Sequence, residues 1–268
     1  MLLSQKDIND YKEKGYLFFP SFLSSHEIIQ LNTELSILIK EESIKVYEKN
    51  EKTIRSLHAP NLQSVVFDDL QSDPRLLEPA MQLLESEVYV HQYKVNLKAA
   101  FDGDVWKWHR DYIFWQKEDG LPKSLLTNVV VYLDEVTEYN GPLMLIPCSH
   151  NVEMKNSRVK GDINQNNNEE WLNHLSADFK YTIDNKEIKT LVDSYGIVAP
   201  KGPSGSVLFF HPELAHASAP NLSPYNRNIA IITYNSISNT PIQESKRPDF
   251  LANKNYSPLK VKIIEKGR

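Results

Sequence analysis

The hydrophobic pattern of the chain begins with a helical period and a short apolar run. Residues 4–14 predict an amphipathic helix, with Ser4 at the N-cap and Gly15 as the stop signal. The run YLFFPSFL at 16–23 is rich in aromatic and aliphatic side chains and predicts a strand. A helix followed by a strand is therefore expected at the start of the fold.

A second helix is predicted to run from Ser24 to about Lys40. Ser24 and Glu27 form the S-x-x-E pattern of a capping box. The apolar residues behind it recur at helical spacing, namely Ile28, Leu31, Leu35 and Leu38. Residues 41–60 are polar and predict irregular structure, and a third helix is expected around 74–86.

From residue 87 onwards the pattern changes to short runs rich in β-branched and aromatic residues. Turn signals such as Asp119-Gly120 and Asn140-Gly141 separate them. Helices that precede strands predict an α+β fold, with the strands forming an antiparallel barrel or sandwich. The expected strands are 88–98, 126–136, 142–147, 205–211 and 228–236.

One segment interrupts this series of strands. Residues 151–200 contain the polar, low-complexity stretch INQNNNEE (163–170), and we expect a mobile surface insert or lid there. No repeat or linker divides the chain, so residues 1–268 are expected to form a single domain.

Composition excludes several functional classes. The chain has 268 residues and a net charge of −5, without the clustered Lys and Arg that phosphate contacts need, so nucleic acid is not an expected partner. The single cysteine, Cys148, allows no internal disulfide and suits a reducing cytoplasm. The N-terminal residues lack a signal-peptide pattern and no segment reaches membrane-spanning length, so a cytoplasmic location without membrane association is expected.

The stretch WKWHRDYIFW (106–115) places two polar groups among aromatic rings. If this stretch is a strand, His109 and Asp111 point to the same face. An imidazole and a carboxylate inside an apolar sheet are costly unless something pairs them, and a divalent metal would do so. This pair therefore predicts two ligands of a metal site.

A third ligand is expected from the stretch FFHPELAHASAPNLSPYNRN (209–228), which offers His211 and His216. Arg227 lies eleven residues after His216, and a turn can bring these two residues together on adjacent strands. That spacing favours His216 over His211. Two histidines and a carboxylate describe the facial triad of non-haem Fe(II) oxygenases. A buried arginine beside them fits an anion such as the distal carboxylate of 2-oxoglutarate.

These motifs resemble those of the phytanoyl-CoA dioxygenase superfamily of Fe(II)/2-oxoglutarate oxygenases. Within it, the chain looks similar to ectoine hydroxylases and to hydroxylases of free L-leucine, L-lysine or L-proline. The resemblance covers the chain outside 151–200 and rests on GYLFFPSFLSSHEI, VYVHQYKVNLKAAFDGDVWKWHRDYIFWQKEDGLP, NGPLMLIPCSH, GSVLFFHPELAHASAPNLSPYNR and RPDF. It implies a double-stranded β-helix (a cupin-like jelly roll) flanked by N-terminal helices.

The resemblance also implies roles for individual residues. His109, Asp111 and His216 match the iron ligands of the family. Halogenating relatives lack the carboxylate, so Asp111 indicates hydroxylation. The residues that match cosubstrate-binding positions are Arg227, Ser218, Asn96 and Gln92. The implied cofactors are Fe(II), 2-oxoglutarate and O2.

Two further residues match positions near the substrate. Trp115 matches an aromatic residue at the substrate pocket, and Arg247 in RPDF is a candidate for binding a substrate carboxylate. The leading hypothesis is a hydroxylase of a small free L-amino acid, with lysine or leucine favoured. Asp102, Asp104 or Glu213 are candidate partners for a lysine ammonium. The alternatives are a hydroxylase of an acyl-CoA or carrier-tethered substrate, and a non-enzymatic cupin-like binding protein.

Overall fold

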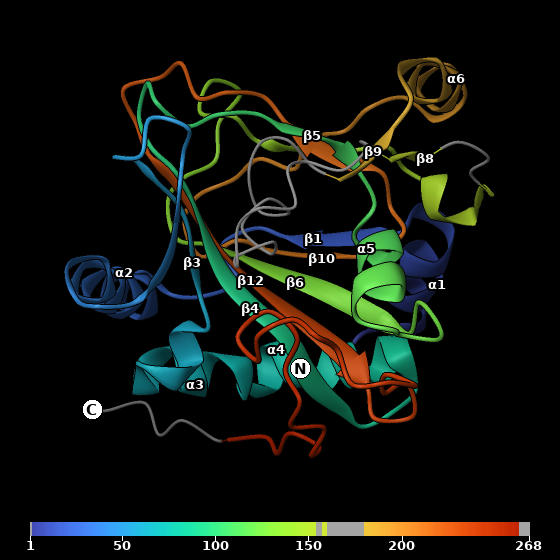
Figure 1. Cartoon of the computed structure of the whole chain (residues 1–268), viewed down its shortest axis with the longest axis horizontal. Helices are drawn as coiled ribbons and strands as arrows, with labels where there is room; N and C mark the ends of the chain where they lie inside the picture. Colours follow the sequence, from blue (N-terminus) through green and yellow to red (C-terminus); the bar gives the residue numbers. More distant parts are fainter. Residues whose placement is uncertain (1, 154–156, 160–179, 263–268) are drawn as a thin grey trace.

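The structure, a computed structural model, describes residues 2–153, 157–159 and 180–262 (Figure 1). It combines antiparallel sheets with helices, as the α+β pattern predicts. No helix within these residues is long and apolar enough to cross a membrane. The helices are α1 (Gln5–Lys14), α2 (Ser25–Lys40), α3 (Val65–Gln71), α4 (Pro74–Leu84), α5 (Asp111–Glu118) and α6 (Asn185–Tyr195), with short 3-10 turns at Pro60–Leu62 and Ser149–Asn151.

Two antiparallel sheets carry the fold. The larger sheet has the order β1 (Tyr16–Phe19), β10 (Val207–Phe210), β6 (Leu126–Tyr132), β12 (Arg227–Ser236), β4 (Val88–Lys98), β3 (Ile54–His58) and β2 (Ile44–Tyr47). The smaller sheet has the order β5 (Trp106–His109), β11 (His216–Ser218) and β7 (Leu143–Leu145). A separate pair joins β8 (Ser157–Val159) to β9 (Tyr181–Ile183).

The larger sheet is buried on both faces. Along β6, Val129 and Val131 join the core that α1 to α4 cover, whereas Val130 and Tyr132 join a second core shared with Leu145 of β7. The alternation follows from the two-residue period of a strand. In Figure 1, α3 and α4 accordingly lie on one side of this sheet, and β5 lies on the other. The space between the two sheets is where polar residues can gather.

The predicted N-terminal elements are confirmed. Ser4 caps α1, and Gly15 ends it with a φ of +83°. A Cβ at Gly15 would lie 2.6 Å from Nδ1 of His150, so both the backbone and the packing require glycine there. The capping box of Ser24 and Glu27 opens α2, whose buried residues are Ile28, Leu31, Leu35 and Leu38.

The prediction of irregular structure at 41–60 is wrong. Strands β2 and β3 form a hairpin there and extend the larger sheet beyond β4. The charged residues of this segment indicated exposed, irregular structure, but Glu48 and Arg55 are buried and pair with each other. Arg55 Nη1 lies 3.0 Å from Glu48 Oε2. Helix α3 was also missed, whereas α4 and the five predicted strands are present within a few residues of their expected bounds.

The predicted insert at 151–200 contains regular structure. Its last twenty residues include β9 and α6, and Ile183 and Leu191 pack against Ile146 and Ala215 of the body. This part therefore adds to the core. Residues 154–156 and 160–179, with the polar stretch 163–170, lie outside the described residues.

Candidate metal centre and pocket

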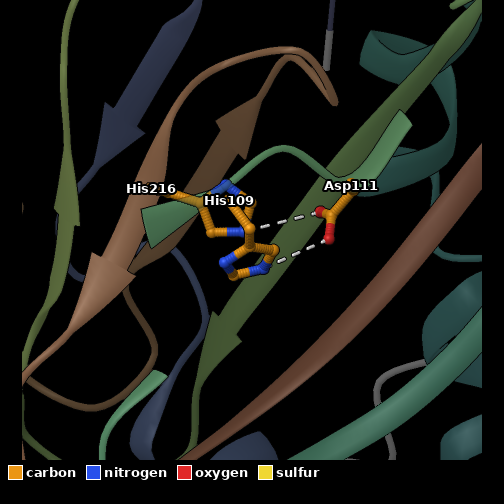
Figure 2. A group of neighbouring side chains, drawn as sticks. All are labelled: His109, Asp111 and His216. Atoms are coloured by element: carbon orange, nitrogen blue, oxygen red, sulfur yellow. Dashed lines mark ion pairs between the residues drawn. The ribbon is translucent and has the colours of Figure 1, made fainter. Parts of the chain in front are cut away.

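His109, Asp111 and His216 lie together between the two sheets (Figure 2). His109 and His216 are register partners on the antiparallel strands β5 and β11, and their ring centroids are 4.1 Å apart. One carboxylate oxygen of Asp111 is 3.6 Å from His109 Nε2, and the other is 3.7 Å from His216 Nε2.

The local structure of this motif differs from the predicted strand. Strand β5 ends at His109, and Asp111 is the first residue of α5. The chain turns at Arg110, so Asp111 points back toward both imidazoles from the start of a helix. The two ligand candidates thus meet through a strand-to-helix turn and not through alternation along one strand.

Hydrogen bonds orient all three side chains. Each imidazole has its Nδ1 at a backbone carbonyl two residues earlier: His109 at Lys107, at 2.6 Å, and His216 at Leu214, at 2.9 Å. These contacts leave both Nε2 atoms directed at one point, as metal-binding histidines require. Asn128 Nδ2 donates to Asp111 Oδ2 at 2.8 Å.

The electrostatics of the cluster suit a cation. Burial and the nearby His109 lower the pKa of His216 to about 4, so its imidazole is neutral at neutral pH. Burial alone would raise the pKa of Asp111, but His216 and His109 bring it well below its usual range. Two imidazoles and a carboxylate on one side of a cavity match the donor set that non-haem Fe(II) prefers.

The same pocket contains a buried arginine, Arg227, on which Asp134 acts through its charge without a direct ion pair among the described residues. Arg227 is 2% exposed; its Nε donates to Gly141 O at 3.2 Å, and it forms no ion pair with any described residue. Burial lowers its pKa to about 10. A guanidinium left in this state is a binding site for an anion. The expectation that Arg227 and His216 occupy adjacent strands is wrong, because β12 belongs to the larger sheet and β11 to the smaller one.

The other predicted cosubstrate residues line the same pocket: Ser218, Asn96 and Gln92. The buried Asn96 Oδ1 has no hydrogen-bond partner. Gln92 Nε2 donates to Leu251 O at 2.9 Å. Its neighbour His91 lies at a β-bulge of β4 and faces the same side, because Val90 and Tyr93 both join the core on the other face. His91 Nε2 is 3.1 Å from Asp119 Oδ2.

Trp115 and Arg247 lie at another side of the pocket. The Trp115 ring on α5 contacts the edge of His91, with centroids 5.5 Å apart. Arg247 Nη1 donates to Asp119 Oδ2 at 2.8 Å, and its guanidinium carbon lies 4.6 Å from the Phe114 ring centroid. Arg247 lines the pocket, and its buried Nε has no hydrogen-bond partner among the described residues.

Sequence reasoning missed three residues of this site. Lys94 and Lys98 share the inward face of β4 with Gln92 and Asn96, and the two-residue period of that strand could have identified them. Lys98 Nζ donates to Ser218 Oγ at 2.7 Å and lies beside Arg227, its partner across the strands. Asn128 carried no signal in the sequence, because only the folded sheet brings it to Asp111.

Comparison with known proteins agrees with this geometry. The profile of the family described as phytanoyl-CoA dioxygenase (PhyH) matches residues 11–229. The chain belongs to this family. The prediction of a 2-oxoglutarate-dependent non-haem iron dioxygenase is thereby confirmed at the level of enzyme class.

Individual relatives cover nearly the whole chain. The L-proline trans-4-hydroxylase of Streptomyces griseoviridis is 33% identical over 250 residues, which are 93% of this chain and 92% of the relative. The ectoine dioxygenase of Halomonas elongata is 32% identical over 260 residues, which are 93% and 76% of the two chains.

A solved structure extends the likeness to three dimensions. The crystal structure of EctD from S. alaskensis with 2-oxoglutarate and 5-hydroxyectoine aligns with a TM-score of 0.80 and 29% identity, covering 97% of this chain and 87% of that one. The structure of the same protein with bound Fe has a TM-score of 0.79.

Proposed function

We propose that this protein is an Fe(II)- and 2-oxoglutarate-dependent hydroxylase of a small free L-amino acid. The observation that carries the proposal is the pairing, in one pocket, of the triad His109, Asp111 and His216 with the buried, unpaired Arg227. The triad supplies ligands for a divalent metal, and Arg227 supplies the counter-charge for an anion beside it. Names of similar proteins, a proline hydroxylase and ectoine dioxygenases, support a small-molecule substrate.

In this proposal His109, Asp111 and His216 hold Fe(II), and Arg227 and Ser218 bind the distal carboxylate of 2-oxoglutarate. Asn96 and Gln92 face the cosubstrate from β4. When bound, Fe(II), 2-oxoglutarate and O2 supply the oxidation that converts an unactivated C–H bond to an alcohol, with release of succinate and CO2.

The protein itself positions the substrate and excludes water. Arg247, which is fixed by Asp119 and lines the pocket, binds the substrate carboxylate. Trp115 and Phe114 form an apolar wall that directs the carbon skeleton toward the triad. The chain acts as one domain over residues 1–268, and the two facing antiparallel sheets support the double-stranded β-helix expected from the sequence.

A screen for substrate-dependent succinate formation tests the function. The purified protein is incubated with Fe(II), 2-oxoglutarate and single L-amino acids, with ectoine and acyl-CoA thioesters included as competing classes. We expect succinate and a hydroxylated product with at least one free amino acid and none with thioesters. Turnover restricted to thioesters, or to ectoine, would assign the enzyme to another substrate class.

A further inference from the structure

The charges that face the pocket are strongly unbalanced. Among its described lining residues, the cationic side chains are Lys94, Arg110, Arg227 and Arg247, whereas Asp111 is the one carboxylate. Asp111 is assigned to the metal and Arg227 to the cosubstrate. Arg110 is bound through Nη2 to the carbonyls of Ser149 and Val152. Lys94 and Arg247 therefore determine which charges a substrate can bring.

Lys94 is the least satisfied of these groups. It lies on β4 between Gln92 and Asn96, and its Nζ forms no hydrogen bond or ion pair with any described residue. It is close enough to Asp111 and to Arg247 for its charge to act on both: burial lowers the pKa of Lys94, Asp111 opposes that shift, and Arg247 adds to it. The ammonium thus lines the same pocket as the metal triad and the proposed carboxylate anchor, and its charge acts on both.

Carboxylates near this region are already engaged. Asp119 accepts hydrogen bonds from Arg247 Nη1 at 2.8 Å and from Ser245 Oγ at 2.9 Å, and its Oδ2 is 3.1 Å from His91 Nε2. Glu118 accepts from Lys180 and Tyr181.

The acids that the sequence suggested as partners for a lysine ammonium, Asp102, Asp104 and Glu213, do not line this pocket. Glu213 lines a separate pocket on the other side of Arg110. The described residues therefore offer no free carboxylate to a second substrate cation.

We propose that Lys94 is a specificity-determining residue that restricts the substrate to amino acids with an uncharged side chain. A second ammonium on the substrate would approach Lys94 in a site of low dielectric, where like charges repel strongly and no carboxylate compensates. Amino acids with leucine-like or proline-like side chains carry no second ammonium and fit the pocket, whereas lysine carries one and does not. This inference rests on the proposed function and narrows its substrate class.

The role of Lys94 is tested with two pairs of ligands, and in each pair the second ligand carries one additional ammonium. The pairs are L-norleucine with L-lysine, and L-proline with 4-amino-L-proline. Binding is measured by calorimetry without O2, on protein loaded with Fe(II) and 2-oxoglutarate. For the native protein we expect the neutral member of at least one pair to bind about tenfold or more tightly than its cationic partner. In Lys94→Met that ratio should fall several-fold, and in Lys94→Glu the preference should reverse.

Controls separate this role from others. Lys189→Met, which removes an exposed lysine of α6, should leave the ratio unchanged. The affinity for 2-oxoglutarate is measured for each variant. A Lys94→Met protein that loses 2-oxoglutarate binding while the ligand ratio stays constant would make Lys94 a cosubstrate residue and overturn the proposal.

The remaining outcomes are distinguishable. Native protein that binds L-lysine or 4-amino-L-proline as tightly as the neutral partner overturns the role of Lys94, while amino-acid hydroxylation stands. If neither pair binds and no free amino acid gives succinate, the proposed function is wrong and the specificity inference falls with it.

Discussion

At the residue scale, Asp111 links the metal site to the body of the fold. Its two oxygens face the two imidazoles, and Oδ2 also accepts a hydrogen bond from Asn128. Asn128 is held in turn by Thr233, whose Oγ1 donates to Asn128 Oδ1 at 2.7 Å. A chain of hydrogen bonds therefore runs from the central strands of the larger sheet to the triad. Such outer contacts fix ligand geometry.

Two variants should distinguish the role of Asp111 as a metal ligand from the role of Asn128 as its hydrogen-bond partner. Asp111→Ala should abolish 2-oxoglutarate turnover with the fold intact, since it removes one of three ligands at a pocket wall. Asn128→Ala should keep the triad and weaken Fe(II) binding by about 10–100-fold. Metal titration and circular dichroism measure both effects. Full activity of Asp111→Ala in Fe(II)-supplemented buffer would show that this carboxylate is not a ligand.

The sequence contained enough to predict the triad but not its surroundings. His109, Asp111, His216 and Arg227 stand at spacings that match the family motif, although Asp111 lies on a helix and not on the predicted strand. Asn128 does not, because its role arises from register: Thr233 pairs with Asn128 across β12 and β6, and no local signal announces that pairing. For Lys94, the two-residue period of polar residues along β4 was the available clue.

At the element scale, the first turn of α2 is held by an interaction that the capping motif alone does not reveal. Glu27 accepts hydrogen bonds from the backbone and hydroxyl of Ser24, and it also pairs with Arg75 of α4. The capping box was readable from four consecutive residues, whereas Arg75 is 48 residues away. The same limit hid β2 and β3, since the pairing of Glu48 with Arg55 appears only after the hairpin forms.

Glu27 should make α2 sensitive to acid. Burial would raise its pKa, but the hydrogen bonds from Arg75 and Ser24 lower it to about 2, from an ordinary value of 4.5. A lowered pKa in the folded state stabilises the protein above the unfolded pKa, and this contribution is lost as the pH falls toward 2.

Comparison with Glu27→Gln, which retains the capping geometry, tests this effect. The native protein should have the larger free energy of unfolding by about 1 kcal/mol at pH 6, a value that allows for solvent screening of a partly exposed pair. The difference should shrink as the pH falls from about 5 to 2. Denaturant unfolding across this range measures it, and a constant difference would assign the effect to packing.

At the scale of the whole molecule, the proposed ligands would join the two sheets. His109 and His216 come from the smaller sheet, whereas Arg227 and Asn96 come from the larger one. A metal on the triad holds one side of the pocket, and a cosubstrate that also reaches Arg227 connects both. Ligands that bind only the folded state stabilise it by RT ln(1 + L/Kd), where L is the free ligand concentration.

The Tm of thermal unfolding should therefore rise in two steps, one for the metal and one for 2-oxoglutarate. Mn²⁺, as a substitute for Fe(II), should raise the Tm of the native protein, and 2-oxoglutarate added with the metal should raise it further. At about 100 times the Kd each step is worth roughly 2.7 kcal/mol, or about 5 °C or more for a chain of this size. Arg227→Leu should keep the first step and lose most of the second, because the cosubstrate loses its buried counter-charge.

Asp111→Ala supplies the complementary control. Because the cosubstrate is expected to bind through the metal, this variant should show neither the Tm increase with Mn²⁺ nor the further increase with 2-oxoglutarate. A second step of native size in Arg227→Leu would mean that another cation, with Lys98 the nearest, binds the distal carboxylate. A metal step of native size in Asp111→Ala would place the ion outside the triad. The first result would require a different cation for the cosubstrate, and the second would require a different set of ligands for the metal.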